Sequence, residues 1–173
     1  MSEFIIGLGS NLGDREYLIE KAIGEIGLSI GRVIARSSLY ESESWGFDSP
    51  NRFLNGAVRV ATDLTPLDLL DALQCLEKNE GRIRIKDYAD RRLDADILLR
   101  MDPGQEIFSG GEEGLKLEIP HPRLHLRKFV LLPLAELAPE WVHPVLSKTA
   151  GELLEACPDR GTISLFRKFR DSR

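Results

Sequence analysis

Cysteine is scarce in this chain of 173 residues, which contains only Cys75 and Cys157. The two do not form a Cys-x-x-Cys pair, so a structural zinc site is not expected, and isolated thiols are typical of a reducing compartment. No apolar run approaches the roughly 18–20 residues that span a bilayer, and no basic segment precedes the short apolar stretch at residues 4–6. We therefore expect no signal peptide, no membrane partner and a cytoplasmic location.

The common nucleotide-binding loops are also absent. The stretch Gly7-Leu-Gly-Ser-Asn-Leu-Gly13 lacks the Gly-Lys-Ser/Thr ending of a P-loop and the Gly-x-Gly-x-x-Gly spacing of a Rossmann site. The net charge is −5, whereas nucleic acids select basic surfaces. No strand carries the aromatic pattern of an RNA-binding sheet. P-loop ATPases and Rossmann enzymes are thereby excluded, and the acidic net charge argues against a nucleic-acid partner.

Positive charge is concentrated in two segments. Residues 81–92 contain five basic and two acidic residues, and residues 160–173 contain five basic and one acidic residue. A basic loop in an otherwise acidic protein indicates one local site for an anionic ligand. For the C-terminal segment, the default interpretation is a solvated charged surface.

Hydrophobic patterning predicts a single domain in which strands and helices alternate. Strands are expected at residues 4–8, 32–43, 52–62, 93–99 and 115–119, and helices at residues 15–26, 66–79, 128–137 and 147–156. Residues 44–51 form the long connection of a hairpin, and the glycine-rich residues 101–114 a mobile surface excursion. This order favours an α+β domain with helices on one face of a largely antiparallel sheet.

Two aspartates give the clearest chemical signal. Asp94 and Asp96 alternate with an apolar residue in a predicted strand, so their carboxylates share a face and repel each other. Mg²⁺ would offset this repulsion, because it uses one or two carboxylates together with substrate phosphates. Four arginines that could neutralise a phosphate chain shortly precede them: Arg82, Arg84, Arg91 and Arg92. The alternative is that these arginines simply neutralise the aspartates of a surface strand.

Three polar residues suit either a ligand or a structural role. Gln74 and Glu77 continue the apolar face of the helix at residues 66–79, where an adenine or ribose could supply hydrogen bonds unless the helix end emerges into water. His121 lies between two prolines, with basic residues close behind it. This position fits a phosphate contact or a structural histidine.

Aromatic residues are few, at 7% of the chain, and three of them lack the spacing of a helical stripe. These are Trp45, Phe53 and Phe129. They could belong to the core, or together with Asn55 they could sandwich and hydrogen-bond a flat heterocycle.

Six short motifs are modest singly and specific in combination. They are Gly9-Ser-Asn-Leu-Gly13, Ser37-Ser-Leu-Tyr40, Phe53-Leu-Asn55, residues 77–84, residues 91–98, and Ile119-Pro-His-Pro-Arg123 with Arg127-Lys-Phe-Val-Leu131. In this order the chain resembles the 6-hydroxymethyl-7,8-dihydropterin pyrophosphokinase family over residues 4–144. Residues 147–173 then form an extension of unknown role within a single domain of residues 1–173.

The resemblance implies a fold, a reaction and partners. The fold is ferredoxin-like α+β, a mostly antiparallel sheet with helices packed on its faces. The reaction transfers pyrophosphate from ATP to the hydroxymethyl group of the pterin and releases AMP, in folate biosynthesis. The expected partners are ATP, the pterin and two Mg²⁺ ions, and the expected state is a monomer.

The resemblance also implies roles for individual residues. Catalytic roles fall on Arg82, Arg91, Asp94 and Asp96, of which the two aspartates are also the Mg²⁺ ligands. ATP contacts fall on Gln74, Glu77, Arg84, Arg91, Ile97, Lys116, His121 and Arg127. Pterin contacts fall on Ser42, Glu43, Trp45, Phe53, Asn55, Asp94 and Phe129.

Four places depart from the family pattern. Tyr88-Ala-Asp90 replaces Trp-Gly-Pro, and Arg92 stands where a small hydroxyl residue is common, which leaves open which arginine acts. Glu43 stands where proline is frequent in the pterin loop, and Lys116 where an arginine is expected.

Two other functions remain as alternatives. One is a different metal-dependent nucleotidyl or phosphoryl transferase, which would bind ATP without affinity for the pterin. The other is a ferredoxin-like module that binds RNA or a regulatory ligand without turnover.

Overall fold

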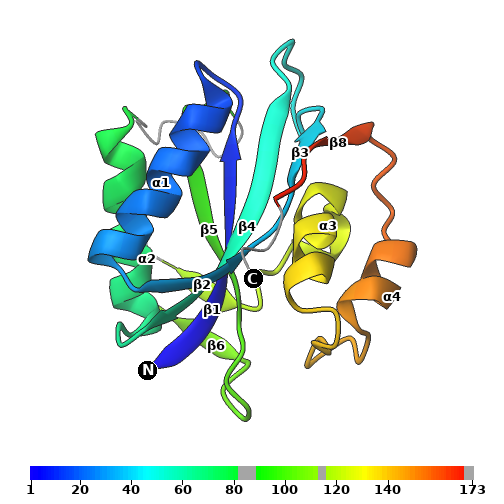
Figure 1. Ribbon diagram of the computed structural model, residues 1–173. Helices are drawn as coiled ribbons and strands as arrows, with labels where there is room; N and C mark the ends of the chain where they lie inside the picture. The colour runs from blue at the N-terminus through cyan, green and yellow to red at the C-terminus, as the bar shows by residue number, and fades with distance from the viewer. Residues whose placement is uncertain (82–88, 113–115, 170–173) are drawn as a thin grey trace.

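The computed structural model describes residues 1–81, 89–112 and 116–169. Its main sheet has six strands in the order β5-β1-β4-β3-β8, and β2 also pairs with β4 (Figure 1). The strands are β1 (Ser2–Ser10), β2 (Arg32–Arg36), β3 (Leu39–Ser42), β4 (Phe53–Thr62), β5 (Asp94–Arg100) and β8 (Ile163–Arg167). All the pairings are antiparallel. With β1 between β4 and β5, this is the α+β, ferredoxin-like arrangement that the resemblance implied.

Apolar residues cover both faces of the sheet. Along β1, Phe4 and Ile6 pack in one core cluster and Ile5 in the other, as the alternation of side chains in a strand requires. Helices α1 (Arg15–Ser29) and α2 (Pro66–Asn79) cover the first face, and α3 (Lys128–Leu137) and α4 (Ala150–Glu155) the second (Figure 1). The expectation of helices on one face alone is therefore wrong.

Local sequence signals place the helix starts. The Asp14 carboxylate accepts a hydrogen bond from the Tyr17 N–H at 3.1 Å and caps α1, and α2 begins with Pro66 behind the Thr65 cap. Helix α4 begins later than predicted, because Ser147 adopts a left-handed conformation with φ 52°. Thr149 caps α4 instead.

Two segments contain more structure than the sequence predicted. The excursion contains the strand β6 (Phe108–Gly110), which pairs with β7 (Leu117–Ile119) in the strand expected at residues 115–119. A short 3-10 helix follows at Leu124–Leu126. The C-terminal segment forms β8 along the edge strand β3, and Arg167 makes an ion pair with Glu16 of α1. Residues 163–167 therefore form an ordered edge strand, whose side chains are exposed apart from the half-buried Ile163. Among the helices described, none is long and apolar enough to cross a membrane.

Candidate active site

A cavity of about 360 Å³ opens beside the ends of β3, β4 and β5 and the start of α3. Its walls combine aromatic, cationic and acidic side chains. The lining residues are Ser42, Glu43, Trp45, Phe47, Phe53, Asn55, Arg91, Asp94, Asp96, Lys116, His121, Pro122, Arg123, Arg127 and Phe129. A single cavity thus gathers most of the residues singled out in the sequence.

Asp94 and Asp96 both line this cavity, as their spacing on β5 predicted. Their partners across the β1 ladder are Gly9 and Gly7, so no β1 side chain covers this part of the strand. A Cβ atom on Gly9 would lie only 3.1 Å from Oδ1 of Asn55. Glycine at this position therefore permits the Asn55 amide to lie close to the aspartates.

Glu77 has a partner within the protein. Its side chain is buried, and Oε1 accepts a hydrogen bond from the Ala95 N–H at 2.9 Å. Ala95 lies between the two aspartates, so this contact fixes the backbone that carries them. Gln74 is half-buried on α2 and the Ile97 side chain is in the core. Neither these two nor Glu77 lines the cavity, and their nucleotide contacts stay predictions.

The structure separates the two arginines that the sequence left ambiguous. The Arg91 side chain is 12% exposed, lines the cavity and donates from Nη1 to Oδ1 of Asp94 at 3.0 Å. The exposed Arg92 instead lies beside Gly13, where its Nη1 would be 3.1 Å from an added Cβ. Arg91 therefore faces the site. The predictions for Arg82 and Arg84 lie outside the described residues.

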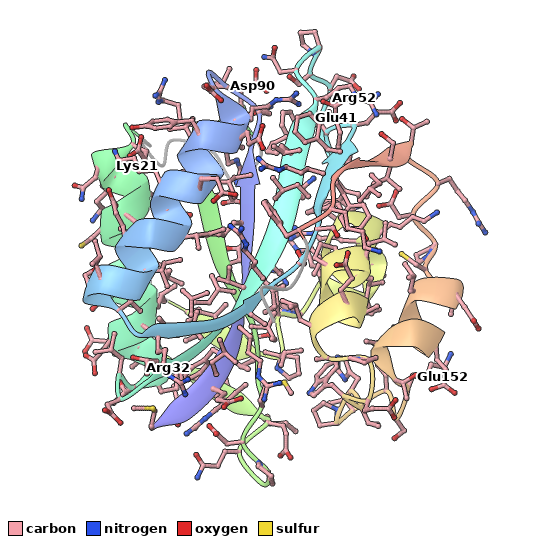
Figure 2. The ribbon with its side chains drawn as sticks, viewed as in Figure 1. Lys21, Arg32, Glu41, Arg52, Asp90 and Glu152 are labelled. Atoms are coloured by element: carbon pink, nitrogen blue, oxygen red, sulfur yellow. The ribbon has the colours of Figure 1, made fainter. Side chains whose placement is uncertain are left out.

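Asp90, which is labelled in Figure 2, stands where the family pattern has proline. It joins three loops. Its carboxylate accepts hydrogen bonds from the Asn11 and Asn51 amides, both at 2.7 Å, and from the Ser49 hydroxyl at 2.6 Å. The Arg91 N–H donates to Oδ1 of Asn11 at 2.7 Å. Asp90 thus ties the loop after β1 and the loop before β4 to the chain entering Arg91.

Replacing Asp90 with alanine should lower the free energy of unfolding by about 1–3 kcal/mol, because it leaves three donors without their charged acceptor. The Ser49 hydroxyl, followed by the Asn51 and Asn11 amides, lowers the pKa of Asp90 below its usual value of 3.8. Since the unfolded chain binds this proton at higher pH, the stabilisation is present above pH 3.8 and is lost as the pH falls through the lower folded pKa.

Urea denaturation at several pH values would measure both effects. Asp48→Ala is the matched control, because Asp48 is an exposed residue of the loop before β4, which Asp90 contacts through Ser49 and Asn51. Equal stability of the Asp90 and Asp48 variants would contradict the joining role.

The second side of the cavity is cationic. Lys116, Arg123 and Arg127 line it together with His121. Burial lowers the pKa of Arg127, which nevertheless stays positive, and no acceptor among the described residues reaches its buried Nε. A buried guanidinium with an unused donor suits an anionic ligand such as phosphate.

His121 is held beside the aspartates by its backbone and its ring. Its N–H donates to the Leu98 carbonyl at 2.8 Å, and Nδ1 accepts from the Arg123 N–H at 3.1 Å. Burial, and then the positive charge of Arg127, lower the pKa of His121 from 6.5 to about 4. The neutral ring therefore keeps Nε2–H as a donor.

An NMR titration of the ligand-free protein should show one imidazole, assigned through His121→Gln, with a midpoint near pH 4. ATP should raise this midpoint, because phosphate favours the charged ring. Since the unfolded chain takes up the proton at higher pH, this group should lower the stability as the pH falls from 6.5 to about 4. A midpoint near 6.5 in the free protein would contradict the burial argument.

Aromatic side chains form a further part of the cavity wall, next to the cationic part. The Phe47 and Phe53 rings meet edge to face at 6.2 Å. The Arg127 guanidinium lies 4.6 Å from the centre of the Trp45 ring and 5.8 Å from that of Phe129. These rings provide flat apolar surfaces beside charged groups, as a heterocycle with a polar substituent requires.

An amide and a hydroxyl lie at the base of this aromatic region. Asn55 Nδ2 donates to Ser42 Oγ at 2.9 Å, and both side chains are buried. The bond fixes the orientation of the amide.

All seven predicted pterin positions line the cavity, and what they bind stays a prediction. Three lining residues were not among the predicted site residues: Phe47, Pro122 and Arg123. Phe47 follows Trp45 and a glycine in a turn-rich loop, a local aromatic pair that could have signalled it. Pro122 and Arg123 lie within the Ile119-Pro-His-Pro-Arg123 motif itself.

The acidic groups suit Mg²⁺ better than a metal held by protein alone. Among the described residues, no cluster of three or more histidine, cysteine or acidic side chains could hold an ion. Asp94 and Asp96 supply two hard oxygen donors next to the cationic side, which matches the use of one or two carboxylates with phosphate oxygens. The donor set therefore fits Mg²⁺ bound together with a phosphate ligand.

Comparison with known proteins gives a consistent result. Residues 5–139 match the model of the 7,8-dihydro-6-hydroxymethylpterin-pyrophosphokinase family. The chain is 41% identical to 2-amino-4-hydroxy-6-hydroxymethyldihydropteridine pyrophosphokinase of Pseudomonas aeruginosa, covering 90% of this chain and 92% of the relative. It is 39% identical to the protein of the same name from Porphyromonas gingivalis, covering 83% and 95%.

Solved structures share the fold at lower identity. An HPPK-DHPS structure in complex with substrates has a TM-score of 0.73 at 14% identity, and Plasmodium falciparum HPPK-DHPS a TM-score of 0.70 at 19% identity. Each alignment covers 90% of this chain, which spans 43% of either solved chain.

Proposed function

The chain belongs to the 7,8-dihydro-6-hydroxymethylpterin-pyrophosphokinase family, and from this membership we propose that the cavity beside β5 is its active site. The enzyme transfers pyrophosphate from ATP to the hydroxymethyl group of 6-hydroxymethyl-7,8-dihydropterin and releases AMP, in folate biosynthesis. The observation that carries the assignment of the site is the position of Asp94 and Asp96 in one cavity with an aromatic side and a cationic side.

The two sides suit the two substrates. The pterin is a flat heterocycle, which the rings of Trp45, Phe53 and Phe129 would sandwich while Asn55 hydrogen-bonds its edge. The polyphosphate of ATP would lie against the cationic side, where Arg127 has an unused donor. The pterin hydroxymethyl group and the β-phosphorus would then meet beside the aspartates.

The reaction needs alignment and charge neutralisation. The hydroxymethyl oxygen forms a bond to the β-phosphorus, the bond from that phosphorus to the bridging oxygen of the α-phosphate breaks, AMP leaves with that oxygen, and the hydroxyl proton is released. A primary alcohol is a weak nucleophile, so holding it in line provides much of the rate. Arg91 would stabilise the negative charge that shifts toward the leaving group.

Mg²⁺ is the expected cofactor, and Asp94 and Asp96 would hold it, in our proposal as two ions. Bound there, it would neutralise phosphate oxygens and keep the two carboxylates ionised. We also propose that residues 1–173 act as one domain and as a monomer in the cytoplasm. The free thiols of Cys75 and Cys157 are consistent with a reducing compartment.

One assay tests this function. The purified protein with ATP, Mg²⁺ and 6-hydroxymethyl-7,8-dihydropterin should release AMP, and omission of the pterin or addition of a chelator should abolish the product. Release of ADP would instead indicate a different phosphoryl transferase. Binding of ATP without turnover or affinity for the pterin would indicate a module without this activity.

A further inference from the structure

The C-terminal segment, residues 159–167, lies outside the family match, which ends at residue 139. After α4 the chain returns past α3 and adds β8 to the edge of the main sheet beside β3 (Figure 1). In this pairing Ile163 lies opposite Ser42, a cavity residue. The segment therefore reaches the aromatic side of the active site.

Thr162 joins the two ends of the loop formed by residues 43–52. Its hydroxyl donates to Oε1 of Glu43 at 2.7 Å and accepts from Nη2 of Arg52 at 3.3 Å. The Glu43 N–H also donates to the Thr162 carbonyl at 3.3 Å. Arg52 additionally pairs with Glu41 of β3, and the two residues lie near each other in Figure 2. One hydroxyl thus links the first and the last residue of the loop.

Asp159 contacts another part of the site, the start of α3. Its Oδ2 accepts a hydrogen bond from the N–H of Lys128, the first residue of α3, at 3.1 Å, and its Oδ1 accepts from the Gly161 N–H at 2.9 Å. The N-cap residue Arg127 makes no side-chain capping bond. A carboxylate from a distant segment therefore caps α3, where it also favours the helix dipole.

Each of these contacts is next to a predicted pterin residue. Glu43 is two positions before Trp45, Arg52 immediately precedes Phe53, and Lys128 immediately precedes Phe129, all of which are aromatic residues of the cavity. Glu43 also stands where the family pattern has a frequent proline, which has no carboxylate to offer. Glu43, which departs from the family pattern, and the C-terminal segment, which lies outside the family match, are thus partners.

We propose that Thr162 and Asp159 are positioning residues that hold the aromatic side of the cavity in the arrangement that binds the pterin. The inference rests on the proposed function for the identity of this ligand. Neither residue lines the cavity, so both act through Glu43, Arg52 and Lys128. The contacts of Thr162 are confined to the loop with the aromatic residues, so its loss should affect the pterin and leave ATP binding unchanged.

The test is Thr162→Val, which removes the hydroxyl and preserves the shape. We expect KM for the pterin and its Kd, measured calorimetrically with a non-hydrolysable ATP analogue and Mg²⁺, to rise about fivefold, as the loss of one net hydrogen bond would cause. We expect kcat and the Kd for the ATP analogue to stay within about twofold. Thr162→Ser retains the hydroxyl and should restore pterin binding.

A double-mutant cycle with Glu43→Ala tests whether Thr162 acts through Glu43. In the Glu43→Ala background, Thr162→Val should have less than half of its effect on pterin Kd, because the shared contact is already absent. Asp159→Ala is an independent variant that should weaken pterin binding about threefold to tenfold by uncapping α3. It keeps the proposal testable if Thr162→Val fails to fold.

Thr149→Val is the matched control. The Thr149 hydroxyl also makes a local hydrogen bond: it caps α4 by accepting from the Glu152 N–H at 3.2 Å, and Thr149 does not line the cavity. It should lower stability without changing pterin KM.

Wild-type pterin affinity in folded Thr162→Val and Asp159→Ala proteins would overturn the inference and leave the proposed function intact. So would equal weakening by Thr149→Val. If the wild-type protein neither binds the pterin nor releases AMP, the proposed function and this inference both fail.

Discussion

Replacing Asp96 with asparagine should lower kcat for AMP release by about a thousandfold while the fold stays intact. The amide preserves the shape of the side chain and removes one of the two negative oxygen ligands expected for Mg²⁺. Asp94→Asn should have an effect of the same order. It also removes the charge-assisted hydrogen bond between Asp94 and Arg91, which is 3.0 Å long in the wild type. Discontinuous assays of AMP with saturating substrates would measure the loss, and circular dichroism would verify the fold.

Measurements of stability would distinguish the loss of a metal ligand from damage to the hydrophobic core. Asp94 and Asp96 share one strand face, so removing one charge relieves their repulsion but also removes an attraction to Arg127. The metal-free Asp96→Asn protein should therefore stay within about 1 kcal/mol of the wild type in urea denaturation. Asp71→Asn serves as the control, since Asp71 is exposed on α2. Full turnover in both active-site variants would refute the metal assignment.

Arg91→Ala should lower kcat by about a hundredfold to a thousandfold, whereas Arg92→Ala should stay within a few-fold of the wild type. The contrast follows from orientation, because Arg91 lines the cavity and bonds Asp94 while the exposed Arg92 lies beside Gly13. Single-turnover measurements with both substrates bound would separate the chemical step from binding.

The lysine variant refines this prediction. Arg91→Lys keeps the charge and loses the planar fork, so it should recover only part of the lost rate. The single variants Arg91→Ala and Arg92→Ala control for each other, since each removes one positive charge from the same loop. A larger loss from Arg92→Ala than from Arg91→Ala would reverse the assignment.

Features set by local periodicity could be predicted from the sequence. The two-residue period of β5 placed Asp94 and Asp96 on one face, and the Asp14 cap marked the start of α1. Similarly, apolar spacing in residues 66–79 placed Glu77 on the apolar face of the helix, with emergence into water as the alternative, and the residue is 1% exposed. These properties depend on residues within one element.

Features that depend on distant partners could not be predicted in the same way. Nothing near Glu77 in the sequence identifies Ala95 as its donor, and Asp90 gathers three donors from two separate loops. The alternation of apolar residues in β1 was compatible with helices on either face, so the helix count on each side had to come from packing.

The C-terminal strand illustrates the same limit at the edge of a sheet. Ile163 is half-buried and the other side chains of β8 are exposed, so its composition resembles a solvated tail. What holds it is backbone pairing to β3 together with the contacts of Thr162 and Asp159. Main-chain hydrogen bonds do not require apolar side chains. A strand whose side chains are mostly exposed therefore shows no hydrophobic alternation from which it could be predicted.

Part of the site is formed by side chains, which substitutions can change, and part by the glycine backbone of β1, which they cannot. Gly7 and Gly9 lie opposite the two aspartates, and an added Cβ would meet Leu98 at 3.2 Å or Asn55 at 3.1 Å. Beside the two aspartates, β1 is therefore bare main chain, whose position follows from strand register. In the proposed site, exchange of a wall side chain would change which heterocycle is accepted, whereas the position of the attacked phosphorus would depend on the backbone of β1 and β5.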